Sequence, residues 1–283
     1  MKSAGRKISK YISLIVIYTS LVCPSIGQDL KYDPKGHPDQ WNFELIPFIL
    51  LPTISGEVQS ERLSKDFGIG PADFISTLQG VFMLDAEVSK GKFFASPAYI
   101  YTYNEVEKVY WTSENGNQTI QASPQLKKNI AELLAGMRFR LKNNFMMDPF
   151  VGFRYTSYHV FGSLAGIVNE TELDEHADFW DPLIGFQAHY YPHSRILVEL
   201  KADIGGFGIG SELTWSVMFN SGYSFSPSVD LLAGFAALSN RYEAETVAGH
   251  PFGMTSVTYG FDLGVRVYFP CRLRDPAVFK RRQ

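Results

Sequence analysis

Charged side chains of both signs recur along the second half of the chain, where they could hold ions, carry protons or pair with each other. The twelve that we assign to one interior network are Glu132, Arg138, Arg140, Asp148, Arg154, Asp181, Glu199, Lys201, Asp203, Glu212, Asp262 and Arg266. Charges removed from water need partners of opposite sign. Because the two signs are mixed along the chain, we predict structural ion pairing. The alternative is an ion-selective constriction.

A glycine-rich segment, "KADIGGFGIGSELTW" (Lys201 to Trp215), could in principle cradle a phosphate. Its glycines Gly206, Gly208 and Gly210 follow G-x-G-x-G, whereas the nucleotide fingerprint is G-x-G-x-x-G and opens a helix. A strand pattern follows here instead. We therefore predict a tight turn that uses the positive φ angles open to glycine, and no cofactor-binding site.

Histidines could supply a general base, but no nucleophile is spaced to work with them. The five considered are His159, His176, His189, His193 and His250, which we interpret as ordinary surface histidines. The acidic run "TELDEHADFWD" could bind a divalent cation weakly, although a solvated charge run is the preferred interpretation. We assign no catalytic residue, no cofactor and no metal site.

Composition excludes several classes of protein. The chain has 283 residues and a formal net charge of -3, so it lacks the basic character of a nucleic-acid-binding protein. No apolar run of the length of a membrane-spanning helix occurs beyond the N-terminal region. One large domain is expected.

The N-terminus predicts export. Lys2, Arg6, Lys7 and Lys10 precede the apolar stretch "YISLIVIYTSLVC", and "SIG" offers small residues for cleavage before Gln28. We predict a signal peptide over 1–27 and a flexible lead-in over 28–40. A short membrane anchor is the alternative. Cleavage would leave Cys271 as the one cysteine of the mature chain, and hence no internal disulfide.

The elements that must position the charged residues are long strands. Alternation of apolar and polar residues marks ten segments: 41–58, 74–89, 92–104, 130–141, 146–160, 178–191, 195–205, 211–225, 229–241 and 255–269. All of them exceed the usual strand of about five or six residues, and they suit a tilted bilayer crossing, which needs about nine to eleven. We therefore predict an all-β, antiparallel, up-and-down transmembrane barrel over 41–269.

The connections alternate in length. "SKGK", "KNNF", "YPHS" and "SPS" are short, whereas the segments between them, including loops 104–129 and 161–177, are long and polar. Outer-membrane barrels show this asymmetry, with short periplasmic turns and long external loops. A soluble barrel gives no reason for it.

The two strand faces predict which side meets lipid. Aromatic residues such as Trp41, Trp180 and Tyr259 lie on the apolar face, which suits a membrane interface. Glycines such as Gly136, Gly152 and Gly185 share the polar face with the charges, as expected of a crowded lumen. The alternative is a soluble barrel with its aromatic residues inside.

Three motifs resemble those of small bacterial outer-membrane β-barrel proteins of uncharacterised function. They are "WNFELIPFILLPTISGEV" near the start, "WDPLIGFQAHYY" (Trp180 to Tyr191) and "DIGGFGIGSELTWSVMFNSGYSFSPSVDLLAGFAAL" (Asp203 to Leu238). The resemblance implies a transmembrane barrel and offers no catalytic residue to carry over. Such barrels end on an aromatic residue, here Phe269, but a basic tail (270–283) follows, which we expect in the periplasm.

Together these features predict a bacterial outer-membrane protein without enzymatic activity, either structural or a narrow pore for small solutes. Its expected partners are outer-membrane lipid and, during biogenesis, the barrel-assembly machinery, with no nucleic acid. The alternatives are a lipid-modifying enzyme and a module that binds ligands or surfaces through its long loops.

Overall fold

The computed structural model describes residues 41–60, 63–105, 109–112, 119–142, 144–165, 170–193, 195–226, 228–247 and 250–269. The predicted signal peptide, lead-in and basic tail lie outside these residues. The strands are β1 (Asn42–Ser60), β2 (Leu63–Ile69), β3 (Leu78–Lys90), β4 (Phe93–Glu105), β5 (Val109–Thr112), β6 (Thr119–Met137), β7 (Phe139–Lys142), β8 (Phe145–Ala165), β9 (Glu170–His193), β10 (Ile196–Gly206), β11 (Leu213–Ser226), β12 (Val229–Val247) and β13 (His250–Phe269).

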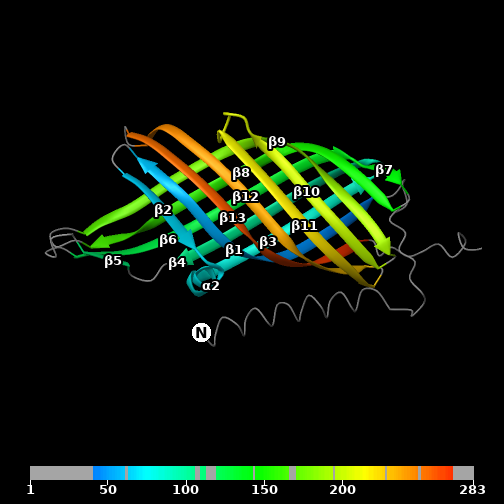
Figure 1. Cartoon of the computed structure of the whole chain (residues 1–283), viewed down its shortest axis with the longest axis horizontal. Coiled ribbons are helices and arrows are strands. Elements are labelled where there is room, and N and C mark those ends of the chain that lie inside the picture. The colour runs from blue at the N-terminus through cyan, green and yellow to red at the C-terminus, as the bar shows by residue number, and fades with distance from the viewer. Residues whose placement is uncertain are drawn as a thin grey trace, which may run out of the picture.

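Ten of the strands close into an antiparallel barrel, as the sequence predicts. In the order β1, β3, β4, β6, β8, β9, β10, β11, β12 and β13 each strand pairs with the next, and β13 pairs back with β1. Neighbours in the barrel are therefore neighbours along the chain, which makes the topology up-and-down. The strands run obliquely along an elongated barrel (Figure 1). Strand β2 pairs with β1, β5 pairs with β6, and β7 follows β6 after a break at Arg138.

Three predicted boundaries are wrong. Strands β8 and β9 pair as far as Ala165 and Glu170, and β5 lies within the predicted loop 104–129, so these connections are largely hairpin extensions. The polar residues of these segments are typical of loops, so the alternation that marks the strands of the wall does not extend clearly into them. Residues 74–77, predicted as strand, belong to the helix α2 (Pro71–Thr77). Pro71 and Asp73 in its first turn suit a helix N-terminus.

Helical structure is otherwise sparse. Among the described residues no helix is long and apolar enough to cross a membrane.

The glycine-rich segment is a turn, as predicted. Strand β10 ends at Gly206 and β11 begins at Leu213. Gly206 and Gly208 have φ angles of 87° and 75°, in the region that favours glycine. The turn is fixed to the wall by Asp181, whose carboxylate accepts a hydrogen bond from the backbone N–H of Ser211 at 2.7 Å. Two of the sequence motifs, around Trp180 and around Gly206, therefore meet in space.

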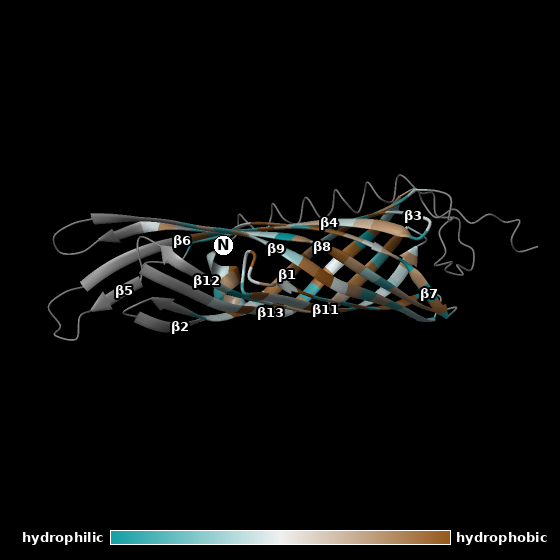
Figure 2. Cartoon of the chain, turned by 90° about the horizontal axis from the view of Figure 1, so that it is seen from above, coloured by the Kyte–Doolittle hydropathy of each residue, from teal (hydrophilic) through white to brown (hydrophobic). Residues whose placement is uncertain are grey.

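The apolar face of the strands points outward and the charged face points inward, as predicted. Large apolar side chains that are exposed on the exterior include Trp41, Phe43, Phe93, Val151, Phe153, Trp180, Ile184, Phe219, Phe225, Phe261 and Leu263. Apolar segments recur along the strands of the barrel wall (Figure 2). By contrast Asp148, Arg154 and Asp203 are buried inside. This arrangement is the inverse of a soluble barrel.

The interior is tightly packed where large side chains lie over glycines of the neighbouring strand. Phe94, Leu134, Phe150 and Leu183 form one buried cluster across β4, β6, β8 and β9. Leu134 lies over Gly152, where an added Cβ would come within 2.6 Å of its Cδ2. Leu183 covers Gly205 in the same way, at 2.5 Å. Glycine on the luminal face thus makes room for a core, as the sequence indicates.

Substitution of Gly152 by alanine should destabilise the barrel by about 1–3 kcal/mol through overpacking. The added methyl group would lie 2.3 Å from the backbone oxygen of Leu133, which cannot move independently of the sheet. Urea unfolding in detergent, followed by the heat-modified gel mobility, measures the change. Gly68→Ala is the matched control because no heavy atom lies within 4 Å of its added Cβ. Equal stability of the two variants would contradict the prediction.

Candidate functional site inside the barrel

Arg138, in the break between β6 and β7, contacts two carboxylates. The backbone N–H of Arg138 donates to the carbonyl of Lys92 on the facing turn at 2.6 Å. Its guanidinium lies 3.0 Å from Glu87 of β3 and 2.8 Å from Asp148 of β8. The Asp148 side chain has no exposed surface. Arg138 therefore links β3 and β8, which lie on either side of β6 in the barrel.

The chain of contacts continues around the lumen through a histidine. His189 of β9 has Nε2 3.2 Å from Asp148 and Nδ1 2.9 Å from Glu199 of β10. Arg266 of β13 then lies 2.6 Å from Glu199 and 3.5 Å from Glu44 of β1. We call these side chains the luminal ring: Glu44, Glu87, Arg138, Asp148, His189, Glu199 and Arg266. Glu44 and Glu87 are cross-strand partners on β1 and β3, so the ring returns to its start.

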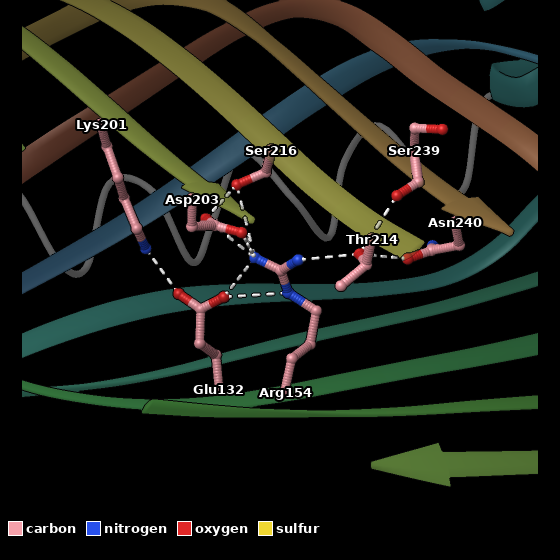
Figure 3. Close-up of polar contacts among 8 residues, drawn as sticks. All are labelled: Glu132, Arg154, Lys201, Asp203, Thr214, Ser216, Ser239 and Asn240. Atoms are coloured by element: carbon pink, nitrogen blue, oxygen red, sulfur yellow. Dashed lines mark hydrogen bonds and ion pairs between the residues drawn. The ribbon is translucent and has the colours of Figure 1, made fainter. Parts of the chain in front are cut away.

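A second group of charges, the Arg154 cluster, consists of Glu132, Arg154, Lys201 and Asp203 (Figure 3). Arg154 of β8 lies 2.7 Å from Glu132 of β6 and 3.0 Å from Asp203 of β10. Glu132 also accepts from Lys201 at 2.5 Å. The Arg154 side chain is 3% exposed and that of Asp203 has no exposed surface, so this pair is desolvated.

Neutral side chains complete the Arg154 cluster. Thr214 accepts from Arg154 at 3.2 Å and donates to the side chain of Asn240 at 2.7 Å (Figure 3). Ser216 donates to Asp203. Charged groups in a low-dielectric interior are stabilised when their remaining donors and acceptors are satisfied. The arrangement therefore supports a fixed structural network.

The structure places the twelve predicted residues in three kinds of position. Eight belong to the luminal ring or to the Arg154 cluster through interior ion pairs, among them Glu132 as the shared partner of Arg154 and Lys201. Asp181 and Asp262 are buried in other roles: Asp181 holds the glycine turn, and Asp262 faces the Asn220 amide at 2.9 Å. Arg140 is exposed on β7, and Glu212 pairs with Arg241 at 2.9 Å where both are largely exposed. These last two lie outside the interior network.

Three members of the luminal ring were not in the predicted network. Glu44 and Glu87 lie on the polar faces of their strands, but the other charges of the ring are far away in sequence, so nothing linked them. His189 was interpreted as a surface histidine, which is wrong: it is buried. His189 lies an even number of residues after Asp181 on β9, so the two side chains point to the same face of the strand. That spacing was the signal that would have placed His189 inside.

The other described histidines lie elsewhere. His159 and His176 are cross-strand partners on β8 and β9, and their rings stack with centroids 3.7 Å apart. His193 is exposed near the turn after β9 and accepts from the backbone of Arg195 at 3.4 Å. None of these three is part of the luminal ring or the Arg154 cluster.

Between the two charged groups lies a small cavity of about 80 Å³. Its wall combines ring members such as Glu87 and Arg266 with apolar side chains, among them Ile46, Phe48 and Met218. A cavity of this size has room for water molecules beside the charged side chains.

The fold and the interior together define a class: a closed antiparallel β-barrel with an apolar outer wall and an ion-paired lumen. No protein-family model and no curated protein matches the chain. Among solved structures it is similar to the outer membrane protease OmpT from Escherichia coli, at 11% identity and a TM-score of 0.48, over 82% of this chain and 98% of that one. The translocator domain of the autotransporter NalP from Neisseria meningitidis matches at 9% identity and a TM-score of 0.41, over 93% and 97%. The outer membrane protein OprG from Pseudomonas aeruginosa matches at 10% identity and a TM-score of 0.35, over 84% of this chain and 99% of that one.

Proposed function

We propose that the chain is a bacterial outer-membrane β-barrel protein without enzymatic activity, with a structural role and a lumen closed to solutes. The observation that carries this proposal is the inverted barrel, with large apolar side chains outside and buried ion pairs inside. An apolar belt of this extent is stable only against lipid. The predicted export signal and the three motifs support the same location. Lipid is then the partner of the wall, and the barrel-assembly machinery its partner during biogenesis.

The packing of the lumen favours a closed barrel over a pore. The cluster of Phe94, Leu134, Phe150 and Leu183 fills one region of the interior. Ion pairs of the luminal ring and the Arg154 cluster cross another region and join strands that are up to three places apart in the barrel. A hydrated ion that crossed would have to separate buried pairs such as Arg154 and Asp203, and breaking a buried pair is unfavourable by several kcal/mol.

Planar-bilayer recordings test the closed lumen. We expect no discrete conductance steps from the wild-type protein, because buried apolar side chains and ion pairs fill much of the described interior. The variant Phe94→Ala with Leu134→Ala removes two plugging side chains and should show steps or a higher open probability. Steps from the wild type equal to those of the variant would overturn the closed-lumen proposal and favour a narrow pore for small solutes.

A lipid-modifying enzyme is the second hypothesis. The buried histidine offers it little support, because both ring nitrogens of His189 face carboxylates, and those carboxylates are also held by arginines. A general base acts on a neighbouring nucleophile instead. Lipid extracts from cells that lack or overproduce the protein would differ in composition if it is an enzyme.

A further inference from the structure

The barrel wall is interrupted between the neighbouring strands β1 and β3. Strands β1 and β3 pair from Asn42–Ser89 to Pro47–Leu84, and no further. β1 resumes pairing on this side only at Ile54, with β2. Residues 48–53 of β1 and 78–83 of β3, all within the described part of the chain, therefore face each other without ladder hydrogen bonds, although each still pairs with its other neighbour. We call this interruption the side gap.

The backbone groups of β1 at the side gap show how it is filled. The N–H of Leu50 donates to the sulfur of Met83 at 3.4 Å, so a side chain stands where a strand carbonyl would be. Residues two apart present their backbone groups to the same side of a strand. Pro52 therefore presents no N–H to the gap. The sequence of β1 itself prevents a full ladder here.

Helix α2 bounds the gap at the end near β2. It follows β2 and leads directly into β3. Asn104 of β4 fixes it by donating to the carbonyl of Phe74 at 3.2 Å and to the hydroxyl of Thr77 at 3.0 Å. Phe74 is buried, whereas Ile75 is exposed. Because the helix is anchored, the movable part of the gap is the Met83 side chain, which is unbranched and adaptable.

The side chains at the side gap are uncharged and mostly apolar. Neither "FILLPT" (48–53) nor "LQGVFM" (78–83) contains a charged residue. On the outside Ile49, Leu51 and Phe82 are exposed to the surroundings of the wall. On the inside Phe48, together with Ile46, lines the luminal cavity. Apolar side chains therefore lie on both the outer and the luminal side of the wall at the gap.

We propose that the side gap is a binding site for one acyl chain of a membrane lipid, which enters between β1 and β3 when the Met83 side chain swings aside. The occupant is lipid because the gap opens on the belt that the proposed function places in the bilayer, and because neither segment carries a charged side chain that could hold a headgroup. The inference therefore rests on the membrane location, but not on whether the lumen conducts.

Quenching by brominated lipid tests this site. In a background where Trp41, Trp111, Trp180 and Trp215 are replaced by phenylalanine, Phe48→Trp places a reporter inside the gap. In vesicles of phosphatidylcholine brominated along its acyl chains, we expect its fluorescence to fall by at least half of the loss seen for Phe219→Trp. Phe219 is 50% exposed on the outer wall and serves as the reference for direct lipid contact.

Phe150→Trp is the matched inward control, since Phe150 is buried and lies on β8, away from the gap. If that variant fails to fold, Tyr158→Trp replaces it. Strong quenching at position 48 with little at the control supports the proposal. Little quenching at 48 overturns it, and so does equal quenching at 48 and at the control. Absence of quenching at position 219 would instead contradict the membrane location.

Discussion

Replacing Arg154 by methionine should lower the free energy of unfolding by about 3–5 kcal/mol, because it leaves buried carboxylates without their cation. The Asp203 side chain has no exposed surface and would lose its ion pair with Arg154. Glu132 would keep only its contact with Lys201. The shift of the urea midpoint in detergent, read from heat-modified gel mobility, measures the loss.

Two further variants isolate the cause of that loss. Arg154→Met combined with Asp203→Asn should recover part of the stability, since the uncompensated charge is removed together with its partner. Arg241→Met removes an arginine whose pair with Glu212 is largely exposed, and should change stability by no more than about 1 kcal/mol. A loss as large for Arg241→Met as for Arg154→Met would show that burial of the pair is not what matters.

Replacing Phe261 by arginine should destabilise the membrane-inserted barrel by about 2–4 kcal/mol if the residue lies near the bilayer midplane. Its side chain is 70% exposed on the outer wall. In a soluble protein a charge at so exposed a position would be harmless. Unfolding of the variant from phosphatidylcholine vesicles, compared with the wild type, measures the effect.

Ile209→Arg provides the control for the lipid-facing wall. Ile209 is 74% exposed, about as much as Phe261. It lies in the turn between β10 and β11 rather than on a strand. We expect almost no change in stability there. If both substitutions were neutral, the exterior would be facing water, and the membrane location would be refuted.

The fold could be predicted from the sequence because its main signal is local. Alternation along segments such as "VTYGFDLGVRVYF" defines both a strand and its two faces, and it needs no knowledge of the partner strand. The predictions failed where that alternation stops. Helix α2 is too short to show a helical period, and the paired ends of β8 and β9 fall in a segment, 161–177, whose polar residues are typical of a loop.

The candidate site could be predicted only in part. Alternation places Arg138, Arg154 and Glu199 on the inward face, but it does not tell which inward charges meet. Pairing depends on the register between strands that are distant in sequence, such as Glu87 with Arg138. The side gap was equally hidden, because the sequence shows Pro52 but not that β3 diverges beside it.

The luminal ring also bears on how the molecule is built. Its last contact joins Arg266 on the final strand to Glu44 on the first. In a sheet whose first and last strands have not yet met, Glu44 would lack this cation, and the ring would be open to water. Pairing of β1 with β13 and completion of the luminal ring therefore happen together. This coupling should make assembly cooperative and leave partly closed intermediates short-lived.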